Sequence, residues 1–101
     1  MTGIVRIGDA VTTHHGCTAS TTIIKATGRT DTVFVNDIAV ALVGDKTSTH
    51  SYGGRNCSAS HQVTFSSGSG TIYAYGTALL RIHDIASGEE LTGGSSTVSA
   101  D

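Results

Sequence analysis

The sequence contains no proline and no tryptophan, and it has few aromatic and few charged residues. Two Phe and three Tyr occur among 101 residues, and charged residues make up 14%. The core of this one small domain must therefore be built mainly from small aliphatic side chains. The net charge of −2 excludes the basic surface that binds phosphate backbones, so we expect no nucleic-acid partner. The chain is too polar for a membrane span and has no charge run, so we expect no stable membrane anchoring.

Glycine, serine and threonine are abundant instead. Thirteen Gly and a shortage of helix formers indicate an all-β fold of many short strands and turns. No signal peptide opens the sequence, which predicts folding in a cytoplasm. In that reducing compartment, we expect Cys17 and Cys57 to bind metal together with histidines rather than to form a disulfide.

A three-residue motif repeats along the chain, each time at the end of an apolar run. The copies are Ile7-Gly8-Asp9, Val43-Gly44-Asp45 and Ile82-His83-Asp84. The runs at residues 4–7, 38–43 and 78–82 are short and rich in β-branched residues, which is typical of strands.

A second pattern repeats in register with the first. Residues 32–37 and 71–76 predict strands that turn into the following apolar run as two hairpins, and residues 94–99 repeat the pattern. We therefore expect three similar β-hairpin units around a pseudo-threefold axis, in a single domain over residues 1–101. The loops after the three motifs should converge at one end; they span residues 10–25, 46–67 and 85–92.

These motifs resemble the PAAR-repeat family, whose repeat reads roughly Gly-Ser-x-Thr-Val-x-x-Asn-Gly-x-Pro-Ala-Ala-Arg-Val-Gly-Asp. Residues 32–37 fit its first half, and residues 41–45 fit its second half with Leu42 in the arginine position. Arg6 and Arg81 keep the arginine in the other two copies.

The chain also departs from the family pattern. The proline that gives the family its name is absent, with Ala39 and Ala78 in its place, and His83 replaces a glycine. These departures concern the turns more than the fold.

The resemblance implies a small conical fold, a triangular pyramid that forms the tip of a contractile injection particle such as a phage tail or a type VI secretion system. Its broad base would cap a homotrimeric β-helical spike, with one tip per trimer, and its apex would carry zinc held by three His and one Cys. Such a protein is made in the cytoplasm, becomes part of a virion or secreted particle, and helps to pierce the target envelope. We expect no catalysis and no fused toxin domain, so that any effector cargo would attach separately.

Alternation along the predicted hairpin strands places Phe34, Tyr73 and Tyr75 on one face. These aromatic side chains either supply contact area to a partner at the base or simply cover the small core.

The middle loop offers three metal ligands. Cys57 and His61 form a Cys-x3-His pair, and His50 lies seven residues before Cys57. A structural zinc site takes four such ligands in a tetrahedron and leaves no open position, so the metal is expected to be structural, with iron as the alternative to zinc.

The first loop supplies the fourth ligand in this scheme, from either His14 or His15. His14 follows Asp9 at the same interval at which His50 follows Asp45, whereas the family-like His-Gly-Cys pattern favours His15. Because the third loop contains no cysteine, Cys57, or less favourably Cys17, would supply the sulfur.

The other polar residues are interpreted as structural. His83 is expected to be a packed or surface histidine, and Glu89 and Glu90 to lie in a solvated loop. Arg6 and Arg81 are expected to pair with nearby carboxylates. Three aspartates recur at strand-to-loop corners, where a carboxylate can accept backbone N–H groups: Asp9, Asp45 and Asp84.

Two other functions stay open at this point. The first is a small metalloenzyme that uses His50, Cys57 and His61 with an open fourth position. The second is a carbohydrate-binding β module that uses the exposed aromatic side chains.

Overall fold

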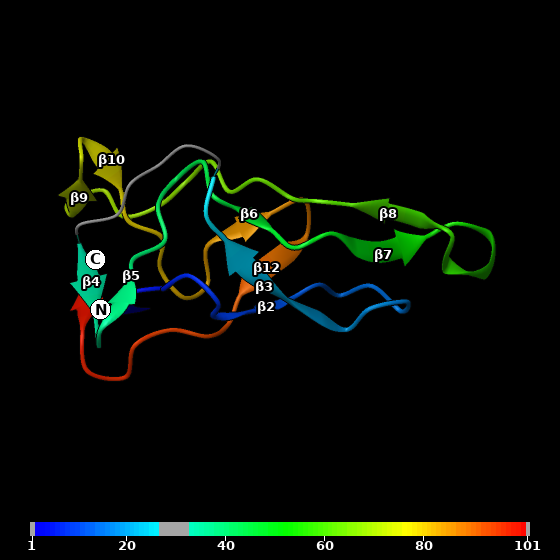
Figure 1. Cartoon of the computed structure of the whole chain (residues 1–101), viewed down its shortest axis with the longest axis horizontal. Helices are drawn as coiled ribbons and strands as arrows, with labels where there is room; N and C mark the ends of the chain where they lie inside the picture. Colours follow the sequence, from blue (N-terminus) through cyan, green and yellow to red (C-terminus); the bar gives the residue numbers. More distant parts are fainter. Residues whose placement is uncertain (1, 27–32, 101) are drawn as a thin grey trace.

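The computed structural model describes residues 2–26 and 33–100 and shows an all-β chain (Figure 1). Within these ranges there are thirteen short strands, one 3-10 turn (η1, Arg55–Cys57) and no α-helix, so no described helix is long and apolar enough to cross a membrane. The all-β class predicted from composition is confirmed.

The largest sheet has five antiparallel strands and draws on all three predicted loops. Its strand order is β11-β12-β2-β3-β6. Two of its pairs join consecutive strands, β11 with β12 and β2 with β3, and the other two pairs bring together parts of the chain that are distant in sequence. The strands are β11 (Ile85–Ala86), β12 (Glu89–Leu91), β2 (Ala10–Thr12), β3 (Ser20–Ile24) and β6 (Lys46–Thr47).

The two predicted hairpins are present. One consists of β4 (Phe34–Val35) and β5 (Ile38–Ala39), the other of β9 (Tyr73–Ala74) and β10 (Thr77–Ala78). Of residues 32–37, which were predicted for the first hairpin, residue 32 lies outside the described residues. Both two-residue turns have positive φ at each central position, as tight hairpins prefer.

The third copy of the pattern is made by the two ends of the chain. β1 (Thr2–Gly3) pairs antiparallel with β13 (Ser99–Ala100). Figure 1 shows this pair and the two hairpins at one end of the molecule, with both termini.

The opposite end is a single long hairpin of β7 (His50–Gly53) and β8 (Ala59–His61), with η1 at its tip (Figure 1). The principal extents of 41 × 29 × 22 Å reflect this projection. We refer to this hairpin, together with residues 13–19 beside it, as the apex, and to the end with three strand pairs as the base.

The three predicted apolar runs pair with one another in a closed cycle. Val5 N–H donates to the Leu80 carbonyl (3.0 Å), Leu80 N–H to Ala41 (3.0 Å) and Ala41 N–H to Val5 (2.9 Å). All three side chains are fully buried. Each run therefore has one neighbour as acceptor and the other as donor, and no edge of the cycle is left open.

Buried apolar side chains form two clusters around this cycle. Phe65 is the largest of them and is the aromatic residue that the core contains. The first cluster lies towards the five-stranded sheet and consists of Val5, Val11, Ile23, Ala41, Phe65, Leu80 and Leu91. The second lies towards the base and consists of Ile4, Val40, Leu42, Ala74 and Leu79.

The recurring aspartates hold the three corners in the same way. In each, an Oδ2 atom accepts the backbone N–H three residues earlier, at 2.7 to 2.8 Å; the donors are Arg6, Leu42 and Arg81. The expected structural role is confirmed, although the carboxylate closes the turn that it ends rather than one that it begins. The expected pairing is also found, since Arg6 and Arg81 bind Asp9 and Asp84 at 2.9 and 3.0 Å.

Candidate metal centre

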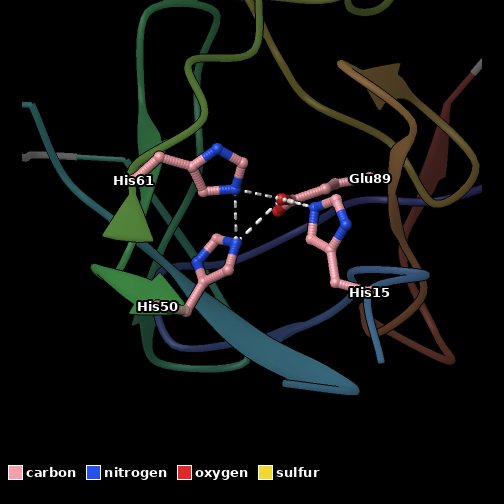
Figure 2. A group of neighbouring side chains, drawn as sticks. All are labelled: His15, His50, His61 and Glu89. Atoms are coloured by element: carbon pink, nitrogen blue, oxygen red, sulfur yellow. Dashed lines mark hydrogen bonds and ion pairs between the residues drawn. The ribbon is translucent and has the colours of Figure 1, made fainter. Parts of the chain in front are cut away.

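Three histidines and one carboxylate converge between the five-stranded sheet and the apex hairpin (Figure 2). The Nε2 atoms of His15, His50 and His61 lie 2.8, 2.8 and 2.7 Å from Oε2 of Glu89. One ligand atom from each residue lies within 4.8 Å of all the others. Three imidazole nitrogens and a carboxylate oxygen gathered in this way could hold a metal ion.

The hairpin register places two of these histidines together. His50 begins β7, His61 ends β8, and the two are directly paired across the strands. Directly opposed residues project to the same side of a hairpin, so both rings face the cluster.

The turn between β2 and β3 presents the third histidine. The Thr13 side chain contacts the Thr18 carbonyl, and Thr13 Oγ1 accepts the His15 N–H at 3.2 Å. Thr13 is fully buried, so the side chain that makes these turn contacts is itself held by the protein interior. His15 therefore stands at a defined position on an otherwise irregular segment.

Glu89 completes the group from β12 and is the most buried member. Its side chain is fully buried, whereas those of His15 and His61 are 22% and 26% exposed. Burial acts to raise the pKa of Glu89, but the hydrogen bonds with His50, His15 and His61 outweigh it and hold the pKa below its ordinary value. The carboxylate is therefore negatively charged at neutral pH.

The distribution of contacts on this carboxylate is uneven. Three imidazole nitrogens crowd Oε2, whereas Oε1 is buried and has no hydrogen-bond partner among the described residues. An unsatisfied buried carboxylate oxygen is costly. A cation placed among the four side chains would neutralise the carboxylate that carries this oxygen.

The tautomer of His50 also favours a cation in this group. Its Nδ1 lies 2.8 Å from the Ser48 carbonyl, which can only accept, so Nδ1 carries the proton. In neutral His50, Nε2 then has a lone pair that faces the carboxylate at 2.8 Å and His61 Nε2 at 3.0 Å. Two acceptors at that distance repel each other unless a proton or a metal ion lies between them. Metal-binding histidines commonly donate their other nitrogen to a carbonyl in this manner.

Tyr52, which no sequence motif singles out, packs against the cluster. The Tyr52 ring stacks on His61 with centroids 4.1 Å apart and planes 14° apart, and it meets His15 edge-on at 6.0 Å. Tyr52 thus packs against two of the three histidines in the group.

The structure brings together three of the five predicted ligands: His15, His50 and His61. His14 lies outside the group; its side chain is 57% exposed, and Nε2 is 3.8 Å from Glu90 Oε1. Between the two adjacent histidines left open by the sequence, His15 is the one in the cluster. Metal binding by these residues stays a prediction.

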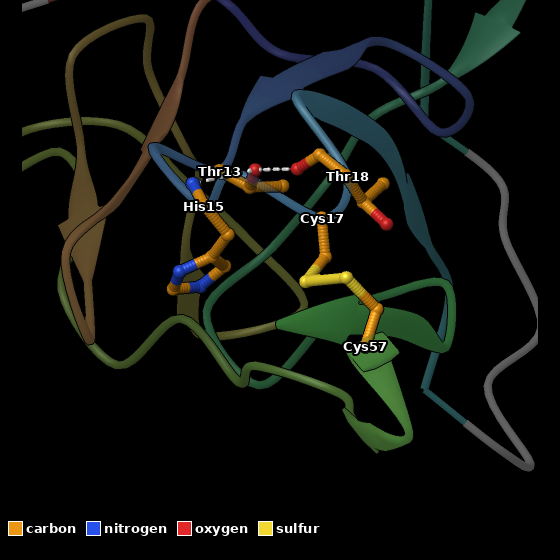
Figure 3. Close-up of a disulfide and its surroundings, with 5 residues drawn as sticks. All are labelled: Thr13, His15, Cys17, Thr18 and Cys57. Carbon is orange, nitrogen blue, oxygen red and sulfur yellow. Dashed lines mark hydrogen bonds between the residues drawn. A yellow bond between two sulfur atoms is a disulfide. The ribbon is translucent and has the colours of Figure 1, made fainter. Parts of the chain in front are cut away.

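Cys57 does not supply a sulfur ligand, which corrects the predicted set. It forms a disulfide with Cys17, and no free cysteine is present in the described part of the chain (Figure 3). A metal binds a thiolate, and a disulfide sulfur has no negative charge to offer. We expected these cysteines to connect the loops by binding a metal; the structure instead connects the loops by a disulfide.

Glu89 was expected in a solvated loop and is instead the fourth member of the group. The expectation is wrong because β12 is paired on both sides, and alternation along it buries Glu89 while Glu90 faces outward to His83 at 2.6 Å. A signal was present in the sequence: Glu89 follows Asp84 at the same interval at which His50 follows Asp45. His83 lies at the surface, with 68% of its side chain exposed, as expected.

No protein-family model matches this chain, and no curated protein matches it.

Proposed function

We propose that this protein is the metal-stabilised tip of a contractile injection particle, with its base seated on a trimeric β-helical spike. The observation that carries the proposal is the closed cycle of three backbone segments, which relates a single chain to a threefold partner. On this proposal the protein has the pseudo-threefold, conical architecture of the PAAR-repeat family, and it acts mechanically rather than as an enzyme.

The cycle supports a threefold end because it recurs at a second level. Three further N–H groups link the same three runs in the opposite order around the molecule, at 2.8 to 2.9 Å: Ile7 donates to Ala39, Val43 to Ala78 and Ile82 to Gly3. A partner with true threefold symmetry presents three equivalent surfaces, and a single chain with three similar units can match them all. This predicts one copy of the protein per spike trimer.

The base has the apolar character that such a contact needs. Phe34, Tyr73 and Tyr75 are 56%, 57% and 48% exposed, and none belongs to either core cluster. Each of the three strand pairs or its flanking residues adds exposed apolar side chains to this end: Val33, Phe34, Ile38, Ile72, Tyr73, Tyr75 and Val98. Aromatic side chains of this kind are enriched in protein interfaces.

The apex has the reinforcement that a pointed end needs. The projecting hairpin contributes no residue to either apolar cluster, and it is tied down by the disulfide and by the group of His15, His50, His61 and Glu89. We propose that zinc, or alternatively iron, occupies this group as a structural ion. Three imidazoles and a carboxylate suit both metals.

The test is binding to the trimeric spike proteins encoded in the same genome. We expect one copy per trimer by light scattering after gel filtration, and we expect Tyr73→Glu to abolish the complex because it places a charge in the apolar base. Tyr52→Glu, at the apex, is the matched control and should bind normally.

Two results would contradict the proposal. One is a protein that binds none of these trimers; the other is a complex lost with the apex variant but kept with the base variant. Identifying the particle that contains the protein would show whether it belongs to a phage virion or to a secretion apparatus. Any effector cargo would be attached separately.

A further inference from the structure

We propose that the Cys17–Cys57 disulfide positions the ligands of the metal centre, so that the oxidation state of the two cysteines and the metal affinity are coupled. This inference rests on the metal centre in the proposed function. It assigns to both cysteines a positioning role rather than a ligand role.

The three histidines of the group belong to two segments that no backbone hydrogen bond connects. His15 lies within residues 13–19, whereas His50 and His61 lie within residues 49–61. The sheet pairing between these parts of the chain ends at Ser48, whose N–H donates to the Thr22 carbonyl at 2.9 Å. Beyond that point no backbone hydrogen bond joins residues 13–19 to residues 49–61, both of which lie in the described part of the chain.

The disulfide makes the missing connection. Cys17 is two residues after His15, and Cys57 lies in η1 at the tip of the hairpin that carries the other two histidines. Figure 3 shows the S–S bond crossing from the β2–β3 turn to the β7–β8 hairpin, with the His15 ring on the same turn.

The histidines alone hold this arrangement weakly. His15 contacts the hairpin through ring contacts with His50 and His61, at centroid distances of 6.1 and 5.4 Å, and through Tyr52. Three imidazoles around one buried carboxylate need a metal ion or added protons to attract one another. Without the disulfide, the metal must therefore also bear the entropy cost of bringing the two segments together.

Coupling of this kind is reciprocal. If closure of the disulfide raises metal affinity by a given factor, bound metal must make the disulfide harder to reduce by the same factor. The reduction itself is an exchange with a dithiol: the S–S bond receives two electrons and two protons and becomes two thiols, while the dithiol closes to its own disulfide.

The experiment compares zinc affinity, measured by competition with a chromophoric chelator, in three samples of the full chain. They are the oxidised protein, the protein reduced by a trialkylphosphine, and the Cys17→Ser/Cys57→Ser variant. The phosphine is oxidised to its oxide, with water supplying the oxygen and the protons. We expect oxidised protein to bind zinc about tenfold or more tightly than the other two samples. Ser58→Ala, which neighbours Cys57 and leaves the disulfide intact, should retain the affinity of the oxidised protein.

A second measurement does not depend on whether the double variant folds. The protein is brought to equilibrium with a dithiol and its oxidised form at a series of ratios, with and without saturating zinc, and we expect zinc to shift the ratio at half-reduction by the factor found for affinity. Equal zinc affinity in all three samples, or equal reduction with and without zinc, would overturn the coupling and leave the metal centre standing.

Two further outcomes are distinguishable. If reduced protein binds more tightly than the double variant and its Co²⁺ form shows an intense thiolate charge-transfer band, the cysteines are ligands and the positioning role is wrong. If oxidised protein binds no zinc, both the coupling and the metal centre of the proposed function fail.

Discussion

The base and the apex of this molecule are the same kind of structure, short antiparallel strands, but they are held together by different forces. The middle and the base enclose two apolar clusters around a closed hydrogen-bonded cycle. The apex hairpin has no such cluster and relies on one disulfide and one group of polar side chains.

The difference shows what a narrow projection requires. A hairpin with solvent on most sides cannot bury enough apolar surface to offset the entropy of ordering it. A cross-link with a sequence separation of 40 residues contributes about 4 kcal/mol by restricting the unfolded chain. Covalent and ionic links thus stabilise the apex where hydrophobic burial is too small.

The largest effect is expected from emptying the core. Phe65→Ala should lower the free energy of unfolding by about 3 to 5 kcal/mol, because a fully buried aromatic side chain leaves a cavity. The loss, measured by urea denaturation, should be the same with zinc and with a chelator, since Phe65 lies in the core rather than at the metal centre. Phe34→Ala, at an exposed aromatic residue, is the control and should cost less than about 1 kcal/mol. A Phe65→Ala effect that depends on zinc would mean that the two regions are not separate.

A substitution at the metal centre, unlike one in the core, should have an effect that depends on zinc. Glu89→Gln should weaken zinc binding at least about a hundredfold, which corresponds to about 2.7 kcal/mol, because it removes the charged member of the group. The thermal stabilisation by zinc seen by calorimetry should disappear with it. Glu90→Gln changes the neighbouring outward-facing carboxylate and should leave zinc affinity unaltered. Equal effects of the two variants would remove Glu89 from the proposed ligand set.

The pH dependence of the zinc-free protein isolates the contribution of the Glu89 carboxylate to stability. Since the pKa of Glu89 is held below its ordinary value of 4.5, its contribution to stability is fully present above that pH and is lost as the pH falls through the lower folded-state pKa. In excess chelator, the unfolding free energy of the wild type should therefore fall more steeply below pH 4.5 than that of Glu89→Gln. Parallel curves for the two proteins would contradict the lowered pKa.

The smallest effect concerns the corners of the cycle. His83 has φ of 79°, and Gly8 and Gly44 have φ of 95° and 100° at the matching corners. His83→Gly should therefore raise the unfolding free energy by up to about 1 kcal/mol by relieving backbone strain, less the hydrogen bond with Glu90. Gly44→Ala is the matched reverse change and should lower it by about 1 kcal/mol. A destabilising His83→Gly would show that the bond to Glu90 outweighs the strain.

The base and the corners were predictable because their signals are local. The hairpins at Phe34–Ala39 and Tyr73–Ala78 follow from strand pattern and turn position, and the corner aspartates follow from a motif of three residues. His50 and His61 were selected from one short stretch that folds back on itself.

The rest depended on contacts between distant parts of the chain. In the sequence, Glu89 resembles its solvated neighbour Glu90. The pairing of β12 with both β11 and β2 decides the face that each side chain occupies. Cys17 and Cys57 meet only because the first and second loops converge, and neither sequence context distinguishes a bridge from a pair of ligands. The sheet of β2, β3 and β6 could not be predicted because it depends on pairs that are not consecutive in sequence: β2 pairs with β12, and β3 pairs with β6.

The pairing of β1 with β13 has a consequence for the order of folding. Thr2 lies opposite Ala100, and the Ile4 N–H donates to the Val98 carbonyl at 3.0 Å, so this strand pair joins residues from opposite ends of the chain. Such a contact closes a longer loop than any other strand pair among the described residues and gains little until the segments between are in place. The third strand pair should therefore be the last to form and the first to open, and the amide hydrogen of Ile4 should exchange with solvent sooner than those of Val5 and Ala41 in the central cycle.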